Sequence, residues 1–364
     1  MRNRFHALCP YFAMFPEQFA EQWIDRLTVP GDLVLDPFCG RGTTPFQSLL
    51  MGRRALASDI NPVAYCVTAA KTQAPKLSTI ERRIRDLSDG YSARSWVPRA
   101  RAQPEFFRAA YTQRTLAQLL YLRSVLNWQG RRADAMVAAL VLGSLHGETE
   151  KSPSYLSAQM PRTISTKPAY SVRYWNERGL KAPERDVFEL LLRQARFRYV
   201  SDPPIGDSTV LLSDFRELPR TNGCDPEIAD CIITSPPYLD VTNFEEDQWL
   251  RLWFLGGPTH PTRRRVSVDD RHERPASYWK MIADFWRTAG YLVRPGGHIV
   301  IRLAGKGLGA EELVQSLVGC STVATRAIEL IDWERSEVVR RQTDAFRPGS
   351  KGVRFEVDAV FRVA

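Results

Sequence analysis

Short apolar runs alternate with helix-type patterns of apolar and polar residues at both ends of the 364-residue chain. The runs are rich in aliphatic and β-branched side chains, which is typical of strands buried on both faces of a parallel sheet. In the helix-type segments, apolar residues recur roughly every three or four positions, as a helix with one buried face requires. The expected strands are 33–36, 54–59, 209–213, 229–234 and 298–302. The expected helices at the two ends are 17–27, one that ends at Leu50, 249–255 and 278–292.

Two further apolar runs near the carboxyl terminus, 325–331 and 353–363, are expected to close the sheet as a hairpin. Strands that alternate with helices in this order predict an α/β fold with a doubly wound, mostly parallel sheet, here seven-stranded. Pro16 lies where a first-turn proline of the helix 17–27 belongs. The sequence Arg-Pro-Gly-Gly at 294–297 predicts a turn before the fifth strand.

The middle of the chain, residues 72–206, breaks this alternation. Helix-type spacing covers most of it, and a segment rich in Ser, Pro, Tyr and Arg at 151–181 is expected to be irregular. The expected helices are 80–87, 104–128, 133–145 and 183–199. Long irregular stretches inside a compact protein are usually functional. We therefore expect an inserted helical subdomain at 72–206, within a catalytic domain formed by 1–71 and 207–364.

The positive charge of the chain is concentrated in this insert. Residues 76–206 hold 22 Lys and Arg against 12 Asp and Glu, whereas the remainder holds 28 against 29. The net charge of +9 therefore arises in one region. Such a surplus indicates a polyanionic partner such as nucleic acid, although basic helices are also common as solvated faces.

A glycine-containing loop follows the first expected strand. Asp36 is followed by Pro-Phe-Cys-Gly-Arg-Gly-Thr-Thr at 37–44, and then by a helix. A strand, a Gly-x-Gly turn and a helix form the opening of a doubly wound sheet that binds a nucleotide-like cofactor. Asp59, at the end of the second strand, lies nineteen residues beyond Gly40, the spacing of an acid that binds ribose hydroxyls. The third glycine of a dinucleotide motif is absent, so the pocket suits an adenosyl group without a pyrophosphate; the alternative is an ordinary tight turn.

A second motif, Ser235-Pro236-Pro237-Tyr238, follows the strand 229–234. Two consecutive prolines fix the backbone and donate no N–H groups, so the carbonyls there are available as acceptors. Such a site suits a planar ligand with an amino group, which stacks on Tyr238 and donates to Ser235 and to the Pro236 carbonyl. The alternative is a strand that ends in a Pro-Pro turn.

Other classes of protein are disfavoured. No run of eighteen apolar residues predicts a membrane span, and the first six residues lack the apolar core of a signal peptide. The six cysteines form no Cys-x-x-Cys pair, which favours reduced thiols in a cytoplasmic protein. The five histidines are not spaced as metal ligands, so no metal is expected.

Together these motifs resemble those of the S-adenosylmethionine-dependent DNA amino-methyltransferases, which modify exocyclic amines of cytosine or adenine. The segment 36–43 is similar to the cofactor loop of that family, 235–238 to its catalytic motif, and Phe15-Pro16 with the following helix to its extra cofactor motif. The resemblance covers about residues 10–70 and 205–305, and it implies the S-adenosylmethionine methyltransferase type of sheet. The cofactor-binding residues that it implies are Phe15, Pro16, Asp36, Phe38, Gly40, Gly42, Thr43, Asp59 and Asp214. The catalytic residues that it implies are Ser235, Pro236, Pro237 and Tyr238.

Serine at the first position of the catalytic motif resembles the cytosine-N4 subgroup, so methylation of N4 of a flipped-out cytosine is the expected reaction. Adenine N6 in DNA and a base in RNA remain alternatives, as does a non-catalytic nucleic-acid-binding regulator that senses the cofactor. The resemblance implies duplex DNA as partner, in a prokaryotic cytoplasm near the nucleoid, and admits a cognate restriction endonuclease. The recognition sequence and the oligomeric state stay open.

The position of the target-recognition region varies within that family. The basic insert and the arginine-rich loop 259–275 are therefore both candidates for DNA contact. The cationic residues proposed to bind DNA are Arg162, Lys167, Arg173, Arg263, Arg264 and Arg265.

Overall fold

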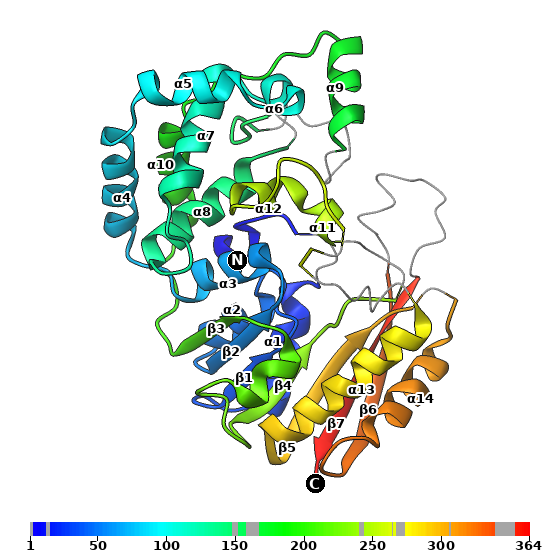
Figure 1. The fold of residues 1–364 in the computed structure, drawn as a ribbon. Helices are drawn as coiled ribbons and strands as arrows, with labels where there is room; N and C mark the ends of the chain where they lie inside the picture. The colour runs from blue at the N-terminus through cyan, green and yellow to red at the C-terminus, as the bar shows by residue number, and fades with distance from the viewer. Residues whose placement is uncertain are drawn as a thin grey trace. The chain divides into compact units, whose positions relative to one another are not determined.

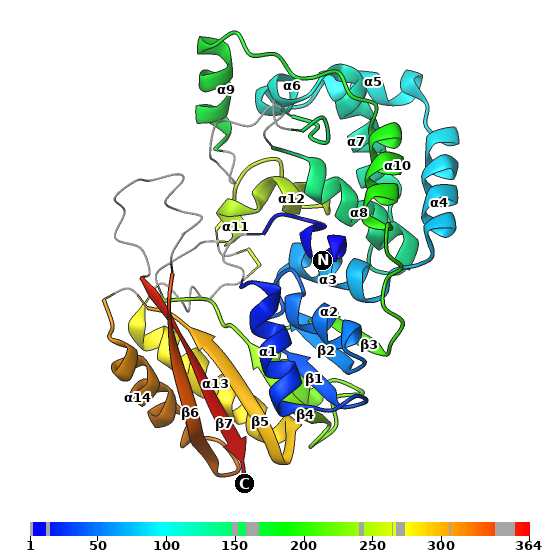
Figure 2. The same ribbon diagram turned by 180° about the vertical axis from the view of Figure 1, so that it is seen from behind.

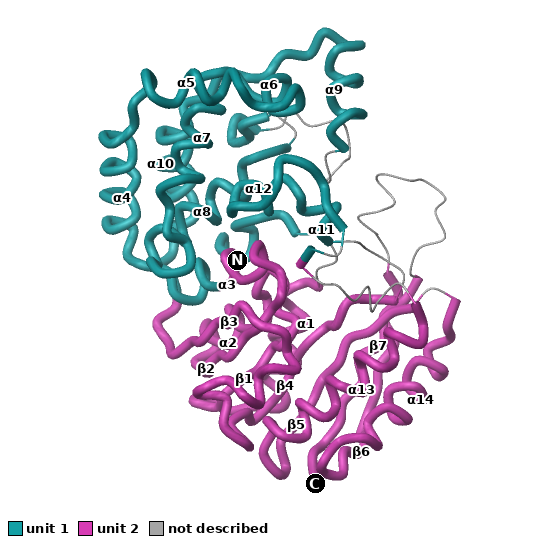
Figure 3. The backbone as a smooth tube through the Cα atoms, viewed as in Figure 1, with its two compact units in different colours: residues 1–12, 69–203, 243–265 teal, residues 13–68, 204–242, 266–364 magenta. Residues whose placement is uncertain are grey.

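The computed structural model describes residues 3–11, 15–147, 152–157, 167–239, 244–263, 265–266, 274–305, 307–338 and 354–364. The chain forms two compact units, coloured separately in Figure 3. Residues 1–12, 69–203 and 243–265 make up one, which we call the helical unit. Residues 13–68, 204–242 and 266–364 make up the other, which we call the sheet unit.

The sheet unit contains a seven-stranded sheet with the order β3-β2-β1-β4-β5-β7-β6 (Figure 1). Its strands are β1 (Leu33–Asp36), β2 (Arg54–Asp59), β3 (Ser208–Leu212), β4 (Ala229–Thr234), β5 (Val293–Leu303), β6 (Ile328–Glu337) and β7 (Phe355–Val363). The first five pair in parallel, and β7 pairs antiparallel with both β5 and β6. The expected doubly wound α/β sheet, with its carboxyl-terminal hairpin, is therefore confirmed.

Side chains of alternating strand positions build a core on each face of this sheet. Val34 of β1 packs with Phe19 and Trp23 of α1 (Glu17–Leu27). Its neighbour Leu35 joins the opposite core, which includes Phe285 of α13 (Pro275–Leu292). Figures 1 and 2 show α13 and α1 on opposite faces, α1 beside α2 (Thr43–Leu50) and α13 beside α14 (Ala310–Ser321). Burial on both faces explains why these strands read as continuous apolar runs.

The chain reverses its direction of winding between β1 and β4. It proceeds from β1 outward through β2 to the edge strand β3, then returns to place β4 on the other side of β1. The crevice at the carboxyl ends of two such strands is the usual ligand site of an open α/β sheet. The β1–β4 boundary is therefore the place to look for a cofactor.

In the helical unit, α8 (Arg132–Ser144) is buried on nearly all sides and packs against α4 and α10. The other helices pack in pairs, such as α5 with α7 and α6 with α9 (Figures 1 and 3). Its helices are η1 (Arg4–Ala7), α4 (Leu77–Asp89), α5 (Ala93–Arg101), α6 (Glu105–Ala110), α7 (Gln113–Val125), α8 (Arg132–Ser144), α9 (Pro168–Glu177), α10 (Val187–Arg198), α11 (Phe244–Asp247) and α12 (Trp249–Phe254), while α3 (Pro62–Thr72) contains the boundary between the units. A bidentate ion pair of Arg83 with the buried Asp134 fastens α4 to α8.

Two segments outside the expected insert pack into the helical unit. The ring of Phe5 lies edge-on against Tyr199 at 4.9 Å, and Arg198 donates to the Arg4 carbonyl. On the other side, the Arg123 guanidinium donates to the carbonyls of Trp253 and Gly257. The helical unit therefore contains residues 1–12 and 243–265 in addition to the insert. The insert itself spans 69–203, whereas the sequence predicted 72–206.

Several local expectations were wrong. The single helix expected at 104–128 is split into α6 and α7, because Tyr111 is extended and Thr112 caps α7 by accepting from the Thr115 N–H. The segment expected to be irregular at 151–181 contains α9, and the helices α3 and α5 were not expected. Residues 294–297, expected as a turn, belong to β5. Pro16 is the residue that precedes α1 and not a residue of its first turn.

None of the helices in the described part of the chain combines the length and the apolarity that crossing a bilayer requires. Within the same described ranges, no group of three or more His, Cys, Asp or Glu side chains is arranged to hold a metal ion.

Candidate active site

Four polar residues lie at the carboxyl ends of four neighbouring strands of the sheet unit. Asp36 ends β1, Asp59 ends β2, Asp214 follows β3, and Ser235 follows β4. Since these strands are parallel and adjacent, the four residues share one edge of the sheet. The sequence predicted all four as site residues.

A buried hydrogen bond joins the two motifs. The Thr234 hydroxyl donates to Asp36 Oδ1 at 2.6 Å, so the residue before Ser235 holds the acid that begins the glycine loop. Both residues have no exposed surface. Burial raises the pKa of the Asp36 carboxyl from 3.8 to about 7. The second oxygen, Oδ2, has no hydrogen-bond partner among the described residues, and an unsatisfied buried acceptor at this edge suits a cationic or N–H-bearing ligand.

The glycine loop has a geometry that only glycine adopts without strain. Gly40 and Gly42 have φ values of +50° and +71°. The Thr68 hydroxyl donates to the Gly40 carbonyl at 3.1 Å, and a Cβ on Gly42 would lie 2.5 Å from that same hydroxyl oxygen. The glycines therefore serve both the turn and the close approach of α3 to the loop.

The Asp59 carboxylate organises the loop from the neighbouring strand. Its oxygens accept from the backbone N–H of Gly40 at 2.9 Å and of Asn61 at 2.8 Å. Burial raises its pKa from 3.8 to about 6, although these N–H groups oppose the shift. Each carboxylate oxygen can accept more than one hydrogen bond, so Asp59 retains capacity for ribose hydroxyls.

The buried Arg41 connects the remaining residues of the amino-terminal motifs. It donates to the Phe15 carbonyl and to the Thr43 hydroxyl. Pro16 is exposed beside them. The ring of Phe38 is half-buried and packs against Phe215 at 4.9 Å.

Asp214 makes local contacts. It precedes η2 (Phe215–Arg220) and accepts from the backbone N–H of Arg216, while its carboxylate also pairs with the Arg216 guanidinium at 3.0 Å. An adenine amine would share this carboxylate with Arg216. The role of Asp214 in cofactor binding remains a proposal.

The Ser-Pro-Pro-Tyr segment continues β4 along the sheet. Ser235 and Tyr238 are half-buried and Pro236 is buried, and the next residue, Leu239, forms a parallel bridge with Gly305 beyond β5. The Tyr238 hydroxyl donates to Glu356 Oε1 at 2.8 Å. Burial and the Glu356 charge together raise the Tyr238 pKa well above 10, so its hydroxyl stays protonated as a donor.

Three charged residues behind Tyr238 were missed in the sequence. Arg302 of β5 forms a bidentate pair with Asp358 at 2.6 and 2.7 Å and approaches Glu356 Oε2 at 3.1 Å. Burial alone would lower the pKa of Arg302, but the pairs with Asp358 and Glu356 outweigh it and leave that pKa above its ordinary value. One signal was present: Glu356 and Asp358 are two positions apart in a mostly apolar strand, so they share a face. Their partner could not be identified from the sequence.

In the helical unit, two of the predicted DNA-binding cations, Lys167 and Arg173, line one hollow, and a third, Arg263, pairs with a residue of its lining. Lys167, Tyr170 and Arg173 line a hollow of about 390 Å³ together with Glu246. Arg263 pairs with Glu246 at 3.0 Å, and the Arg265 backbone N–H donates to Glu245. Arg162 and Arg264 lie outside the described residues.

A Gly42→Ala substitution is expected to destabilise the loop and to weaken cofactor binding. The positive φ costs an L-residue about 1–2 kcal/mol, and displacing Thr68 adds overpacking of about 1–3 kcal/mol. Gly31→Ala is the matched control, because Gly31 has φ +94° with no atom within 4 Å of an added Cβ. Urea unfolding and calorimetric titration with S-adenosylmethionine compare the two proteins. Equal losses of unfolding free energy and of cofactor affinity in both would refute the steric role of Thr68.

Residues 2–71 match the family model described as DNA methylase, N6_N4_Mtase. A curated relative, the type II methyltransferase M.MjaII of Methanocaldococcus jannaschii, is 30% identical over 82 residues, which are 22% of this chain and 16% of that enzyme. The aligned segment is thus a small part of the relative's own length.

Among solved structures, TrmN from Thermus thermophilus has a TM-score of 0.37 at 13% identity, with 100% of this chain and 53% of that chain covered. The rRNA methyltransferase aviRa from Streptomyces viridochromogenes has a TM-score of 0.35 at 13% identity, with 100% and 94% covered. Scores this low carry no argument about function. The amino-terminal match, which contains the glycine loop and Asp59, supports a relationship to the DNA amino-methyltransferases and S-adenosylmethionine as the cofactor.

Proposed function

We propose that the protein is a DNA methyltransferase that transfers a methyl group from S-adenosylmethionine to the exocyclic N4 of a flipped-out cytosine. The observation that carries the proposal is the Thr234–Asp36 hydrogen bond, which holds the glycine loop and the Ser-Pro-Pro-Tyr segment side by side. A cofactor in the loop and an amine beside Ser235 would then be neighbours. Positioning of this kind is the main source of rate in a direct transfer.

The described residues fit S-adenosylmethionine. Asp36 offers a buried oxygen without a partner, which suits a cationic ligand, and Asp59 offers acceptors for ribose hydroxyls. Phe38 supplies a half-buried aromatic ring at the edge of the sheet where Asp214 also lies, and we assign the adenine of the cofactor to this place. When bound, the cofactor supplies an electrophilic methyl group on its sulfonium.

The residues after β4 are assigned to the target base. A base in a duplex hides its amine, and extruding it costs a few kcal/mol. Stacking on an aromatic ring such as Tyr238 is worth about 1–3 kcal/mol per base. Ser235 and the Pro236 carbonyl accept from the amine, which directs its lone pair towards the methyl group. Glu356 holds the Tyr238 hydroxyl and so fixes the plane of the ring.

The helical unit is assigned to the DNA duplex. Its cations Lys167 and Arg173 lie at one hollow with Tyr170, a residue that is 46% exposed and whose ring is contacted by the Arg173 guanidinium. Cations interleaved with aromatic rings are suited to a nucleic-acid backbone and its bases. A cytoplasmic, nucleoid-associated enzyme with a cognate restriction endonuclease would be consistent with this role.

Transfer of a labelled methyl group from S-adenosylmethionine to mixed genomic DNA, with total RNA in parallel, tests the proposal. Label in DNA alone is expected. Label in RNA alone would reassign the substrate, and tight binding of DNA and cofactor without transfer to either would indicate a regulator.

Cofactor affinity is expected to rise with pH across the range set by Asp59 and Asp36, whose pKa values are about 6 and about 7. Below these values the carboxyls are protonated, and a cationic ligand must expel the protons to gain charged partners. For each proton that binding releases, the affinity for S-adenosylmethionine rises by up to about tenfold per pH unit, since one pKa unit is 1.36 kcal/mol. Calorimetric titration at pH 6 in two buffers of different ionisation enthalpy measures the release. Asp36→Asn should reduce the number of protons released. Equal heats of binding in the two buffers would mean that no proton is released, and would contradict the assignment.

A further inference from the structure

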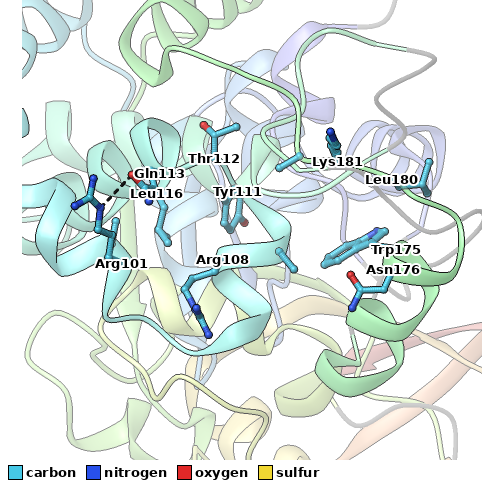
Figure 4. Close-up of a pocket in the computed structure, with 13 residues that line it drawn as sticks. Arg101, Arg108, Tyr111, Thr112, Gln113, Leu116, Trp175, Asn176, Leu180 and Lys181 are labelled. Carbon is cyan, nitrogen blue, oxygen red and sulfur yellow. Dashed lines mark hydrogen bonds between the residues drawn. The ribbon is translucent and has the colours of Figure 1, made fainter.

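A second cavity in the helical unit lies apart from the hollow of Lys167 and Arg173. It has a volume of about 590 Å³ and is formed where the end of α5, the α6–α7 junction and the end of α9 with residues 180–182 come together (Figure 4). In Figure 4, Tyr111 lies in the middle of the group, with Trp175 on one side and Gln113 and Arg101 on the other. Nothing in the motifs described so far involves this cavity.

Three cations line the cavity: Arg101, Arg108 and Lys181, all exposed. No carboxylate lines it, and within the described ranges none of the three forms an ion pair. Arg101 donates to the side-chain amide oxygen Oε1 of Gln113 at 3.3 Å, a neutral partner. Some cations elsewhere in the same unit are paired: Arg83 with Asp134, Arg114 with Asp186, and Arg196 with Glu81. At the cavity, by contrast, three cations share one lining that contains no carboxylate.

The inner wall is apolar and carries one unsatisfied donor. Trp175 is 3% exposed, and its indole Nε1 has no hydrogen-bond partner among the described residues. Tyr111, 1% exposed, donates its hydroxyl to the Leu145 carbonyl, and its ring is covered by its neighbours. A buried N–H without an acceptor costs about 1–3 kcal/mol. The amides of Gln113 and Asn176 add polar groups at the rim.

We propose that this cavity binds a nucleotide through its phosphate, which the cations Arg101, Arg108 and Lys181 receive. Anions bind where cations are unpaired, and a phosphate accepts charge-assisted hydrogen bonds from Arg and Lys. A nucleotide of the bound DNA and a free nucleoside monophosphate share this chemistry. That the source is DNA rests on the proposed function, whereas the binding chemistry of the cavity does not.

The full-length Arg108→Gln/Lys181→Gln protein tests this inference, with Arg132→Gln as the matched control. Arg132 is an exposed cation of α8 in the same unit and does not line the cavity. Fluorescence anisotropy measures affinity for a duplex DNA between 50 and 200 mM salt, roughly the range over which phosphate contacts dominate. Loss of a phosphate contact should reduce the slope of log K against log salt by about 0.9–1 in the double variant and not in the control. Deoxyadenosine 5′-monophosphate is titrated into the same proteins by calorimetry.

A reduced slope in the double variant alone supports DNA as the source. Equal slopes with monophosphate binding that the double variant loses support a free nucleotide. Equal slopes together with no monophosphate binding to the wild type overturn the proposal. If the double variant unfolds, Arg108→Gln alone decides, with Arg108→Lys expected to restore binding. These readouts are binding measurements, so an absence of methyl transfer would count against the proposed function and leave the result at the cavity standing.

Discussion

The Ser235→Ala protein is expected to bind S-adenosylmethionine and DNA as the wild type does, and to transfer methyl groups tens- to a thousandfold more slowly. Ser235 lies directly after β4, beside the Asp36 site, and its hydroxyl is assigned as an acceptor for the target amine. This acceptor matters most while the amine becomes tetrahedral. Loss of one preorganised polar group at a reacting centre costs about 2–4 kcal/mol of transition-state stabilisation. Single-turnover kinetics on a mapped DNA site measures the rate.

Tyr238→Phe is the comparison for this experiment. It keeps the ring that stacks on the base and removes only the hydroxyl that donates to Glu356. Largely retained transfer is therefore expected, with 2-aminopurine fluorescence at the target reporting an unchanged extrusion of the base. Wild-type rates in Ser235→Ala would contradict its role. Loss of transfer in Tyr238→Phe would show that the Glu356 contact, and not stacking alone, is essential.

Arg302→Met is expected to lower the free energy of unfolding by about 3–5 kcal/mol, because it leaves buried carboxylates without their counter-charge. Arg302 is 8% exposed and Asp358 is 5% exposed, and their bidentate pair lies behind Tyr238. The Arg302 guanidinium also lies 4.0 Å from the ring centre of Phe19, so the loss includes packing against α1. Urea denaturation followed by tryptophan fluorescence measures the change.

Arg294→Gln is the matched control on the same strand. Its ion pair with Asp230 is as short, at 2.5 Å, but its side chain is 49% exposed. Exposed pairs contribute about 0–1 kcal/mol. Similar losses in the two variants would mean that burial of the Arg302 pair does not determine its contribution.

The strands were predictable because burial on both faces of the sheet favours apolar residues at successive positions. Apart from Asp36, Asp230 and Thr234, the residues of β1 and β4 are apolar, since alternate residues face α1 and α13. The glycine loop was predictable from its residue types, because only glycine takes the φ angles found at Gly40 and Gly42 without strain. The break between α6 and α7 was missed because its signal, the Thr112 cap, lies inside a continuous helix-type pattern.

The charged cluster behind Tyr238 could not be predicted, because its partners are far apart in the sequence. Arg302 lies on β5 and Asp358 on β7, and their contact depends on the antiparallel register that places these two residues opposite each other. The inclusion of 1–12 in the helical unit likewise rests on long-range contacts, such as Phe5 with Tyr199. A linear pattern does not encode which distant segment supplies the partner.

The central claim is the identity of the methylated atom. DNA methylated by the purified protein with isotopically labelled S-adenosylmethionine is digested to nucleosides, and the products are separated by liquid chromatography with mass detection. The account predicts label in N4-methyldeoxycytidine, and tens- to a thousandfold less of it in a parallel reaction with Ser235→Ala over the same short time. Label in N6-methyldeoxyadenosine, or no labelled nucleoside from DNA, would contradict it.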